Sequence, residues 1–208
     1  MTNTTSDEQD AADMVRLAQG HDAGLSELMA RHGEGLFHYL IRQVQSEAEA
    51  SDLAQEAFVR VYQNRAKFDP CQKFSTWIYA IATNLGRDRL RWRSRHPQVS
   101  LEAEDEHSGT TLLEHLADGR PTPDQTMQSG ERVETVRKAV AGLPEELRTP
   151  LILAEFEERS QAEIAAILKC SPKAVEMRLY RARNQLRERL AEELESPLEM
   201  GPEPGHSR

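Results

Sequence analysis

Apolar residues recur at intervals of three and four positions along most of this 208-residue chain, and this spacing predicts helices. β-Branched and aromatic residues are too sparse to predict strands. We therefore expect an all-α fold. The predicted helices cover roughly residues 10–19, 22–44, 47–64, 75–93, 131–141, 144–156, 161–168 and 172–190.

The helical pattern breaks over residues 97–130, where three prolines and seven acidic side chains surround one short apolar cluster. This composition is typical of a flexible acidic linker with at most one short helix. The linker separates two predicted small helical domains, residues 12–96 and residues 131–190. The polar segment 1–11 is predicted to be disordered, and residues 191–208 form a short acidic tail.

Several residues mark where the predicted helices begin, bend or end. Ser46, followed by Glu49 three residues later, is typical of a capping box at the start of the helix over 47–64. Gly33 and Gly35 interrupt the apolar pattern of the preceding helix and predict a bend. Pro150 lies inside the pattern over 144–156, where it predicts a kink or a later helix start.

The predicted helix over 75–93, with Ser75 as its N-cap, carries two stripes. The apolar stripe consists of Phe74, Ile78, Ile81, Leu85 and Trp92. The second stripe consists of Trp77, Ala80, Asn84, Arg87, Arg91 and Arg95. An aromatic ring, an amide and guanidinium groups in one line can stack on a base, read a base edge and follow a phosphate backbone. The same pattern also fits a solvated basic helix whose tryptophan belongs to the core.

The last two predicted helices have the layout of a helix-turn-helix. Ser160 is the expected N-cap of the short helix over 161–168, and a turn over 169–171 leads to Ser171, the expected N-cap of the final helix. The outward face of the final helix presents Lys173, Glu176, Met177, Tyr180, Arg183, Asn184 and Arg187, with Arg181 at its flank. A generic helical bundle would share the apolar stripes, but the turn and the basic outer face favour DNA contact.

The net charge of −9 is unevenly distributed along the chain. Residues 73–96 hold six basic side chains against one acidic side chain, and residues 169–189 hold seven against two. Acidic residues dominate the remainder, so the long-range field opposes approach to a phosphate backbone. We expect weak DNA binding by the chain alone, with another component bringing it to DNA.

Other features exclude several classes of protein. The two cysteines, Cys71 and Cys170, lie far apart and are expected to be reduced thiols. The N-terminus lacks the features of a signal or transit peptide, and no apolar run approaches the roughly 20 residues that span a bilayer. None of the seven histidines has metal-ligand spacing to cysteine or carboxylate, and neither a Walker loop nor a nucleophile elbow occurs. The sequence predicts a soluble cytoplasmic protein with no catalytic site, no metal and no cofactor.

Two sequence segments together resemble a known family. Residues 52–58, Asp-Leu-Ala-Gln-Glu-Ala-Phe, and residues 74–84, Phe-Ser-Thr-Trp-Ile-Tyr-Ala-Ile-Ala-Thr-Asn, resemble the conserved core domain of bacterial sigma factors of the extracytoplasmic-function group, within the sigma-70 family. Residues 161–165 and 175–183 resemble the promoter-reading domain of that group. The resemblance covers roughly residues 12–190, with both domains in the expected order. It implies a protein that binds core RNA polymerase, recognises two promoter elements and promotes DNA melting.

The resemblance also implies partners. Core RNA polymerase would be contacted at its β′ clamp helices and its β flap, and an anti-sigma factor would hold the protein inactive. The residues matching the helix that grips the clamp helices are Asp52, Gln55, Glu56 and Phe58. From the polar pattern alone, the exposed side of this helix fits an ordinary solvated face equally well. The acidic linker matches the segment that family members thread through the RNA exit path.

Promoter contacts are implied for both domains. At the minus-ten element, Phe68 matches the loop that accepts a flipped base and Asn84 matches a base-contacting position. The full minus-ten set is Phe68, Trp77, Asn84, Arg87, Arg89 and Arg91. The minus-thirty-five set is Lys173, Glu176, Met177, Arg178, Tyr180, Arg181 and Arg183. Glu176 departs from the family, because some members carry a basic residue there.

A free-standing helix-turn-helix repressor or activator is the alternative function. It would use residues 131–190 for DNA and residues 12–96 for a signal or for dimerisation. Such a protein should bind duplex DNA without polymerase. It offers no reason for the stripe that contains Trp77, Asn84 and Arg91.

Overall fold

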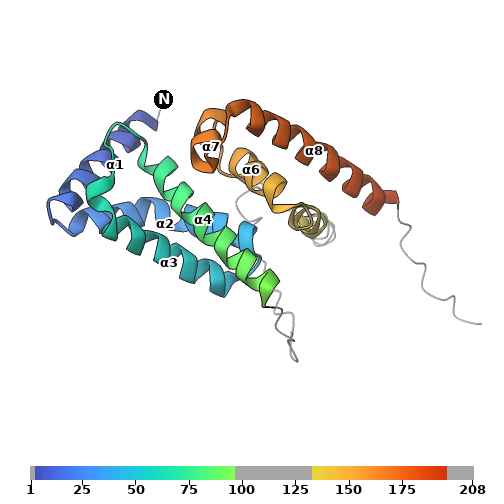
Figure 1. Ribbon diagram of the computed structural model, residues 1–208, viewed down its shortest axis with the longest axis horizontal. Coiled ribbons are helices and arrows are strands. Elements are labelled where there is room, and N and C mark those ends of the chain that lie inside the picture. The colour runs from blue at the N-terminus through green and yellow to red at the C-terminus, as the bar shows by residue number, and fades with distance from the viewer. Residues whose placement is uncertain (1–2, 97–132, 196–208) are drawn as a thin grey trace, which may run out of the picture.

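The structure is a computed structural model that describes residues 3–96 and 133–195 (Figure 1). Every regular element in these two ranges is helical, and they form two helical domains, which confirms the all-α fold class. The expected linker over 97–130 lies outside the described residues. The first domain contains α1 (Asn3–Ala18), α2 (Ala23–Val44), α3 (Glu47–Gln63), the short 3-10 helix η1 (Arg65–Lys67) and α4 (Phe74–Arg95). The second contains a helix over 133–141, α6 (Glu145–Glu155), α7 (Gln161–Leu168) and α8 (Pro172–Glu195).

The core of the first domain lies where α2, α3 and α4 meet. Tyr39 of α2 is fully buried and shares a hydrogen bond with the Thr83 hydroxyl of α4 at 2.7 Å. The Gln43 amide also donates to the Tyr39 hydroxyl at 3.0 Å. These bonds satisfy polar groups that would otherwise be costly to bury, so they fix α2 against α4.

The expected disorder over residues 1–11 is wrong from Asn3 onward, because α1 already begins there. Two carboxylates of α1 are buried against α2. Asp10 accepts from the Arg31 guanidinium at 2.9 Å and lies 2.7 Å from His32 Nε2, while Asp13 also pairs with Arg31. Gly24 permits the close approach of the two helices, since a Cβ there would lie 2.5 Å from the Asp13 carbonyl oxygen.

Neither the two glycines of α2 nor Pro150 ends its helix, and the later helix start offered for Pro150 is wrong because α6 begins at Glu145. The α2 helix runs unbroken through Gly33 and Gly35. The α6 helix continues through Pro150, which lies in a stretch of buried residues from Leu147 to Leu153. Burial of this stretch offsets the one backbone hydrogen bond that proline removes, so tertiary packing overrides the local signal.

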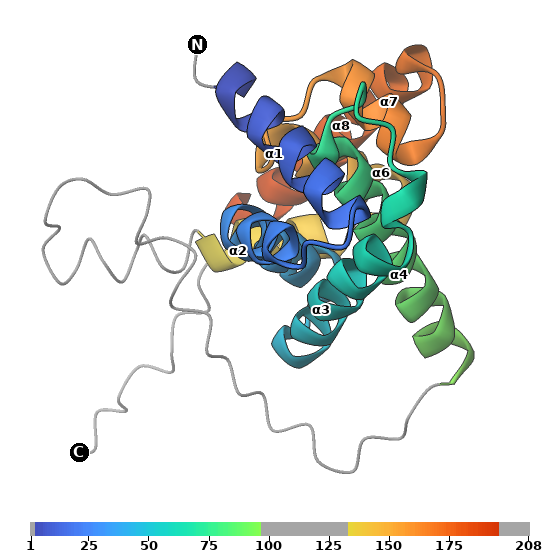
Figure 2. The same cartoon turned by 90° about the vertical axis from the view of Figure 1, so that its left-hand side faces the viewer.

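The two domains are packed against each other. α7 lies against α4, and α6 lies against α2 (Figures 1 and 2). Buried apolar residues from both domains belong to one continuous cluster. The helix-turn-helix therefore rests on the helix that carries the predicted minus-ten residues.

Candidate nucleic-acid and protein interfaces

The predicted stripe on α4 has an exposed half and a partly covered aromatic end. Asn84 and Arg91 are exposed. Trp77 is half-buried, with its ring centroid 5.2 Å from that of Phe68 and 6.3 Å from that of Phe74. Trp77 thus belongs partly to the core and partly to the surface. This placement lies between the two interpretations of the sequence, a ring exposed for base stacking and a ring in the core. Its ring orientation is fixed by packing.

Phe68 offers little surface for stacking, because only 9% of it is exposed. It follows η1 and packs edge-on against Phe74 at 6.2 Å as well as against Trp77. The next residues form a turn in which the Cys71 amide donates to the Asp69 carboxylate at 2.9 Å. In this arrangement, the Phe68 ring packs against the Trp77 ring, and the turn over 69–72 that follows Phe68 is exposed.

The start of α4 differs from the expectation. Its N-cap is Lys73, whereas Ser75 lies buried inside the first turn. The Ser75 hydroxyl accepts a hydrogen bond from Arg159 of the second domain at 3.1 Å. The predicted cap is therefore wrong, because Ser75 is used in a tertiary contact.

The three arginines predicted to follow phosphates have different partners. Arg87 donates to Glu145 of α6 at 2.7 Å, and Arg89 donates to Glu49 of α3 at 3.2 Å. Arg91 is exposed, and its nearest carboxylate is Asp88, 4.0 Å away on the same helix. Arg91 is thus the member of this group that is free to meet a phosphate in the described arrangement.

The sequence did not indicate the role of Glu49, which joins the ends of α3 and α4. Its carboxylate pairs with Arg93 as well as with Arg89, and Arg93 also donates to the Val44 carbonyl at 2.9 Å. Only half of the expected capping box forms, because Ser46 Oγ accepts from the Glu49 amide while the Glu49 side chain turns to these arginines. A residue that looked like a helix cap is instead an ion-pair centre.

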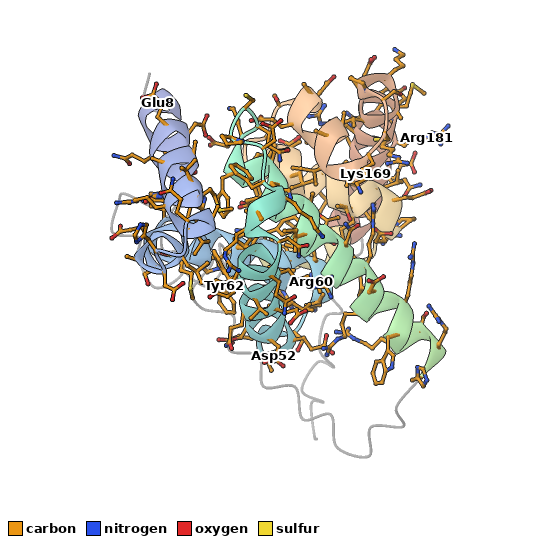
Figure 3. The ribbon with its side chains drawn as sticks, turned by 60° about the vertical axis from the view of Figure 1, so that its left-hand side comes forward. Glu8, Asp52, Arg60, Tyr62, Lys169 and Arg181 are labelled. Carbon is orange, nitrogen blue, oxygen red and sulfur yellow. The ribbon has the colours of Figure 1, made fainter. Side chains whose placement is uncertain are left out.

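The polar face of α3 presents most of the predicted polymerase-binding residues. Asp52, Gln55 and Glu56 are exposed, and Glu56 pairs with Arg60 at 2.9 Å. Figure 3 labels Asp52 and Arg60 on this helix. Phe58 is buried in the core, so its side chain is not part of this exposed face. The burial follows from helical geometry, since Phe58 is adjacent to the apolar stripe of α3.

A groove of about 440 Å³ lies between α3 and α4. Its lining residues are Asp52, Leu53, Glu56, Leu85, Asp88, Arg89 and Trp92. Trp92 was expected in the apolar stripe, but 47% of it is exposed, and its ring stacks on His96 at 4.8 Å. The groove joins the predicted polymerase-binding face to the end of α4.

The helix-turn-helix has the predicted layout. Ser160 and Glu163 form a complete capping box at the start of α7. Lys169 ends α7 in the left-handed conformation, with φ of 51°. The Ser171 hydroxyl then accepts from the Ala174 amide at 3.2 Å, and α8 begins at Pro172. Local capping chemistry is sufficient to set these boundaries.

The predicted minus-thirty-five residues on α8 fall into two groups. Met177, Tyr180 and Arg181 are exposed, Tyr180 most of all at 63%, and Arg181 lies at the outer edge of the domain (Figure 3). The remaining members are held by neighbours. Lys173 pairs with Glu176 at 2.9 Å, Arg178 donates to Cys170 Sγ at 3.7 Å, and Arg183 pairs with Glu155 at 2.7 Å. The Lys173 ammonium partly neutralises Glu176, which reduces its repulsion of phosphate.

Glu163 links the capping box to the first domain. Burial alone would raise its pKa, but hydrogen bonds from Ser160 and Lys73 outweigh burial and bring the pKa to about 2. The Lys73 ammonium lies 3.0 Å from the Glu163 carboxylate. The ionised form is therefore favoured in the folded protein.

Replacing Glu163 with Gln is expected to lower the thermal midpoint at neutral pH and to have little effect in strong acid. The depressed pKa stabilises the folded state above the ordinary value of 4.5, and this contribution is lost as pH falls from 4.5 to about 2. Thermal unfolding of both proteins across this range measures the difference. An equal difference at neutral and strongly acid pH would contradict the charge-based explanation.

The described residues contain no group of three or more histidine, cysteine or acidic side chains able to hold a metal ion. Cys71 and Cys170 are free thiols. Within residues 3–96 and 133–195, no helix is long and apolar enough to cross a membrane.

Comparison with known proteins decides the family. Residues 28–96 match Sigma-70 region 2, and residues 134–186 match Sigma-70 region 4. The chain is 32% identical over 176 residues to the ECF RNA polymerase sigma factor SigW of Bacillus subtilis, which covers 84% of this chain and 93% of that protein. The chain belongs to the extracytoplasmic-function group of sigma factors. This sigma factor is also 32% identical over 175 residues to the ECF RNA polymerase sigma-E factor of Escherichia coli strain K12, covering 82% of this chain and 88% of the relative.

Solved structures agree with the fold of this sigma factor. CnrH in complex with the cytosolic domain of CnrY matches with a TM-score of 0.65 at 26% identity, covering 88% of this chain and 98% of that chain. The sigma factor RpoE of Bartonella quintana, in complex with the anti-sigma factor NepR, matches with a TM-score of 0.60 at 22% identity, covering 80% and 96%. The second match supports the fold alone.

Proposed function

We propose that this sigma factor binds core RNA polymerase through the exposed face of α3 and directs it to promoters. α8 reads the minus-thirty-five element, and the exposed face of α4 binds the minus-ten element and favours its melting. The observation that carries the proposal is on α4, where exposed Asn84 and Arg91 share a helical face with the fixed ring of Trp77. An aromatic ring, an amide and a cation in that order along the helix suit an unstacked strand better than an intact duplex.

Polymerase would supply the affinity that the acidic chain lacks. The net charge is −9, and two of the three arginines predicted to follow phosphates on α4 are paired with carboxylates. Holding two weak DNA-reading faces on one enzyme raises their effective concentration at a promoter. Capture of an unstacked base offsets an unpairing cost of a few kcal/mol. The nucleotide chemistry stays with the polymerase, and the site of action is the cytoplasm.

Transcription from a genomic promoter library tests the proposal directly. Core polymerase is assayed with and without the chain, and new start sites are expected only when the chain is present. Asn84→Ala is expected to reduce transcription from these sites about tenfold, because a base-edge contact is worth about 1–3 kcal/mol. Gln19→Ala is the matched control, since it removes an exposed amide at the end of α1.

Two results would contradict the proposal. One is the absence of new start sites together with tight duplex binding by the chain alone, which would favour a free-standing helix-turn-helix regulator. The other is an equal loss of transcription in the Asn84 and Gln19 variants, which would show that the α4 face has no specific role.

We also propose that an anti-sigma factor binds this chain and that the second domain contacts the polymerase β flap. The support for the first is that CnrH, which is 26% identical to this chain, was solved in complex with a second protein, the cytosolic domain of CnrY. A tagged chain would be recovered from its native cells, and each bound protein would be added to the transcription assay. A binder that leaves transcription unchanged is not an anti-sigma factor.

A further inference from the structure

α1 precedes the residues that match Sigma-70 region 2, yet it packs against the elements that carry the predicted minus-ten residues. It lies along α2 and also contacts η1 and α4 (Figures 1 and 2). Near its N-terminal end, Asp7 pairs with the Lys73 ammonium at 3.4 Å, and Lys73 is the N-cap of α4. Because η1 ends just before Phe68 and Lys73 follows it, α1 contacts the chain on both sides of Phe68.

His32 of α2 connects α1 to the aromatic residues at the start of α4. Its Nε2 atom lies 2.7 Å from a carboxylate oxygen of Asp10, and only 15% of its side chain is exposed. An ionised carboxylate only accepts hydrogen bonds, so Nε2 carries the hydrogen that is donated. The centroid of the imidazole ring lies 5.1 Å from that of Phe74, the first residue of α4. His32 therefore contacts a carboxylate of α1 and a ring of α4 at the same time.

Phe74 belongs to a cluster of three rings with Phe68 and Trp77. The centroids of each pair are at most 6.3 Å apart. Phe68 and Phe74 are buried, whereas Trp77 is half-buried and reaches the surface. Aromatic pairs at such distances prefer particular relative orientations. The orientation of the His32 ring therefore bears on Phe74, and that of Phe74 bears on Trp77.

The hydrogen bond from His32 is not needed to neutralise Asp10. The Arg31 guanidinium already donates to the other carboxylate oxygen of Asp10 at 2.9 Å. A phenylalanine in place of His32 could also pack on Phe74, but its terminal torsion would have no polar restraint, and such torsions have broad minima. The bond between Nε2 and a buried carboxylate sets the rotation of the imidazole ring. Its effect is thus on orientation as well as on charge.

We infer that His32 is a positioning residue for the minus-ten surface. Asp10 holds the ring of His32, and this ring orients Phe74. Phe74, together with Phe68, fixes Trp77 for stacking on an unpaired base. A ring that is ordered in advance loses less conformational freedom when a base is captured. The inference rests on the proposed function and deepens it, because it names two residues outside the DNA-contacting set on which base capture depends.

Fluorescence of the full chain tests the orientation of Trp77 without polymerase or DNA. The chain contains two tryptophans, so a Trp92→Phe background leaves Trp77 as the sole reporter. His32→Gln keeps a donor for Asp10 but removes the ring. It is expected to shift the Trp77 emission to longer wavelength and to lower its anisotropy, because the indole gains water contact and motion.

Asp10→Asn tests the same connection while keeping the His32 ring. It leaves a single acceptor oxygen for the two donors, Arg31 and His32. A smaller change of the same kind in the Trp77 signal is expected. Adding Asp10→Asn to His32→Gln is expected to cause no further change, because the ring on which Asp10 acts is already absent. Additive changes would mean that α1 affects Trp77 by another route and would overturn the inference.

Asp13→Asn is the matched control. Asp13 is buried on α1 like Asp10, but its carboxylate pairs with Arg31 and Arg16 rather than with His32. Its loss is expected to lower the thermal midpoint and to leave the Trp77 emission at the wild-type value. Circular dichroism and thermal unfolding establish that every variant is folded at the temperature of measurement. An equal change of the Trp77 signal in the Asp13 variant would assign the effect to general loosening of α1.

Binding of the holoenzyme to a fork template with an already melted minus-ten element is the second measurement, made with chains that retain Trp92. His32→Gln is expected to weaken this binding about tenfold, in line with the loss of one base–aromatic stacking contact. Its affinity for core polymerase is expected to be unchanged, because the exposed face of α3 is untouched. Unchanged Trp77 emission, or unchanged fork binding despite altered emission, would overturn the positioning role. A wild-type holoenzyme that fails to bind the fork would refute the proposed function, whereas the Trp77 signal would still show whether His32 orients the ring.

Discussion

Reversing the charge of Asp52 and Glu56 together, each to Arg, is expected to weaken binding to core RNA polymerase by about 100-fold. Both carboxylates are exposed on the face of α3 and line the groove between α3 and α4. The attraction between these two carboxylates and basic groups of the polymerase would be replaced by repulsion between like charges. Such repulsion at close range costs several kcal/mol. Glu56→Arg additionally places a cation one helical turn from Arg60.

A matched variant separates local repulsion from the change in net charge. Glu8→Arg with Glu34→Arg alters the net charge by the same amount, but these exposed residues lie on α1 and α2. Fluorescence anisotropy of the labelled chains against core polymerase measures both affinities, and thermal unfolding checks that both variants fold. Equal weakening by the two variants would assign the effect to the overall field and would remove α3 from the proposed interface.

Helix ends were predictable wherever capping chemistry is local. Ser160, Glu163 and Ser171 identify the boundaries of α7 and α8 because each hydrogen bond joins residues only three positions apart. The same logic failed at Ser75, whose hydroxyl accepts from Arg159 of the other domain. A capping signal therefore predicts a helix end only while no distant group competes for it.

The partners of the basic residues could not be read from helical spacing. Arg87, Arg89 and Arg91 were grouped as residues that follow phosphates, but their partners differ because two of them reach carboxylates on other helices. Glu145 is 58 residues away from Arg87 in sequence, and Glu49 is 40 residues away from Arg89. Ion pairs at such separations depend on how the helices pack, which periodicity does not specify.

The burial of single side chains was misjudged both for polar residues that are buried and for an apolar residue that is exposed. Asp10 lies in the segment that was predicted to be disordered, yet it is buried together with Asp13 because Arg31 and His32 face them from α2. The exposed ring of Trp92 shows the opposite case, since it follows the apolar spacing of α4 but lines an open groove. In each case the deciding information is the neighbouring helix, not the helix itself.

Replacing Arg181 with Glu is expected to reduce transcription from promoters that depend on the minus-thirty-five element by about 10-fold to 100-fold. Arg181 is exposed on α8 beside Tyr180, and no ion pair joins it to a side chain in the described parts of the chain. The substitution would remove the proposed contact to phosphate or guanine and add repulsion from the DNA backbone. Lys138→Glu is the control, because it reverses an exposed charge in the same domain on the helix over 133–141.

Holoenzyme transcription on paired templates distinguishes a minus-thirty-five contact from a general defect. One template carries both promoter elements, and the other carries the minus-ten element as an already melted fork without the upstream element. The Arg181 variant is expected to lose activity on the first template and to match the wild type on the second, because the proposed function assigns the fork to α4 alone. A similar loss on both templates would mean that Arg181 acts through folding or polymerase binding. Full activity on the complete promoter would place the recognition surface elsewhere on the second domain.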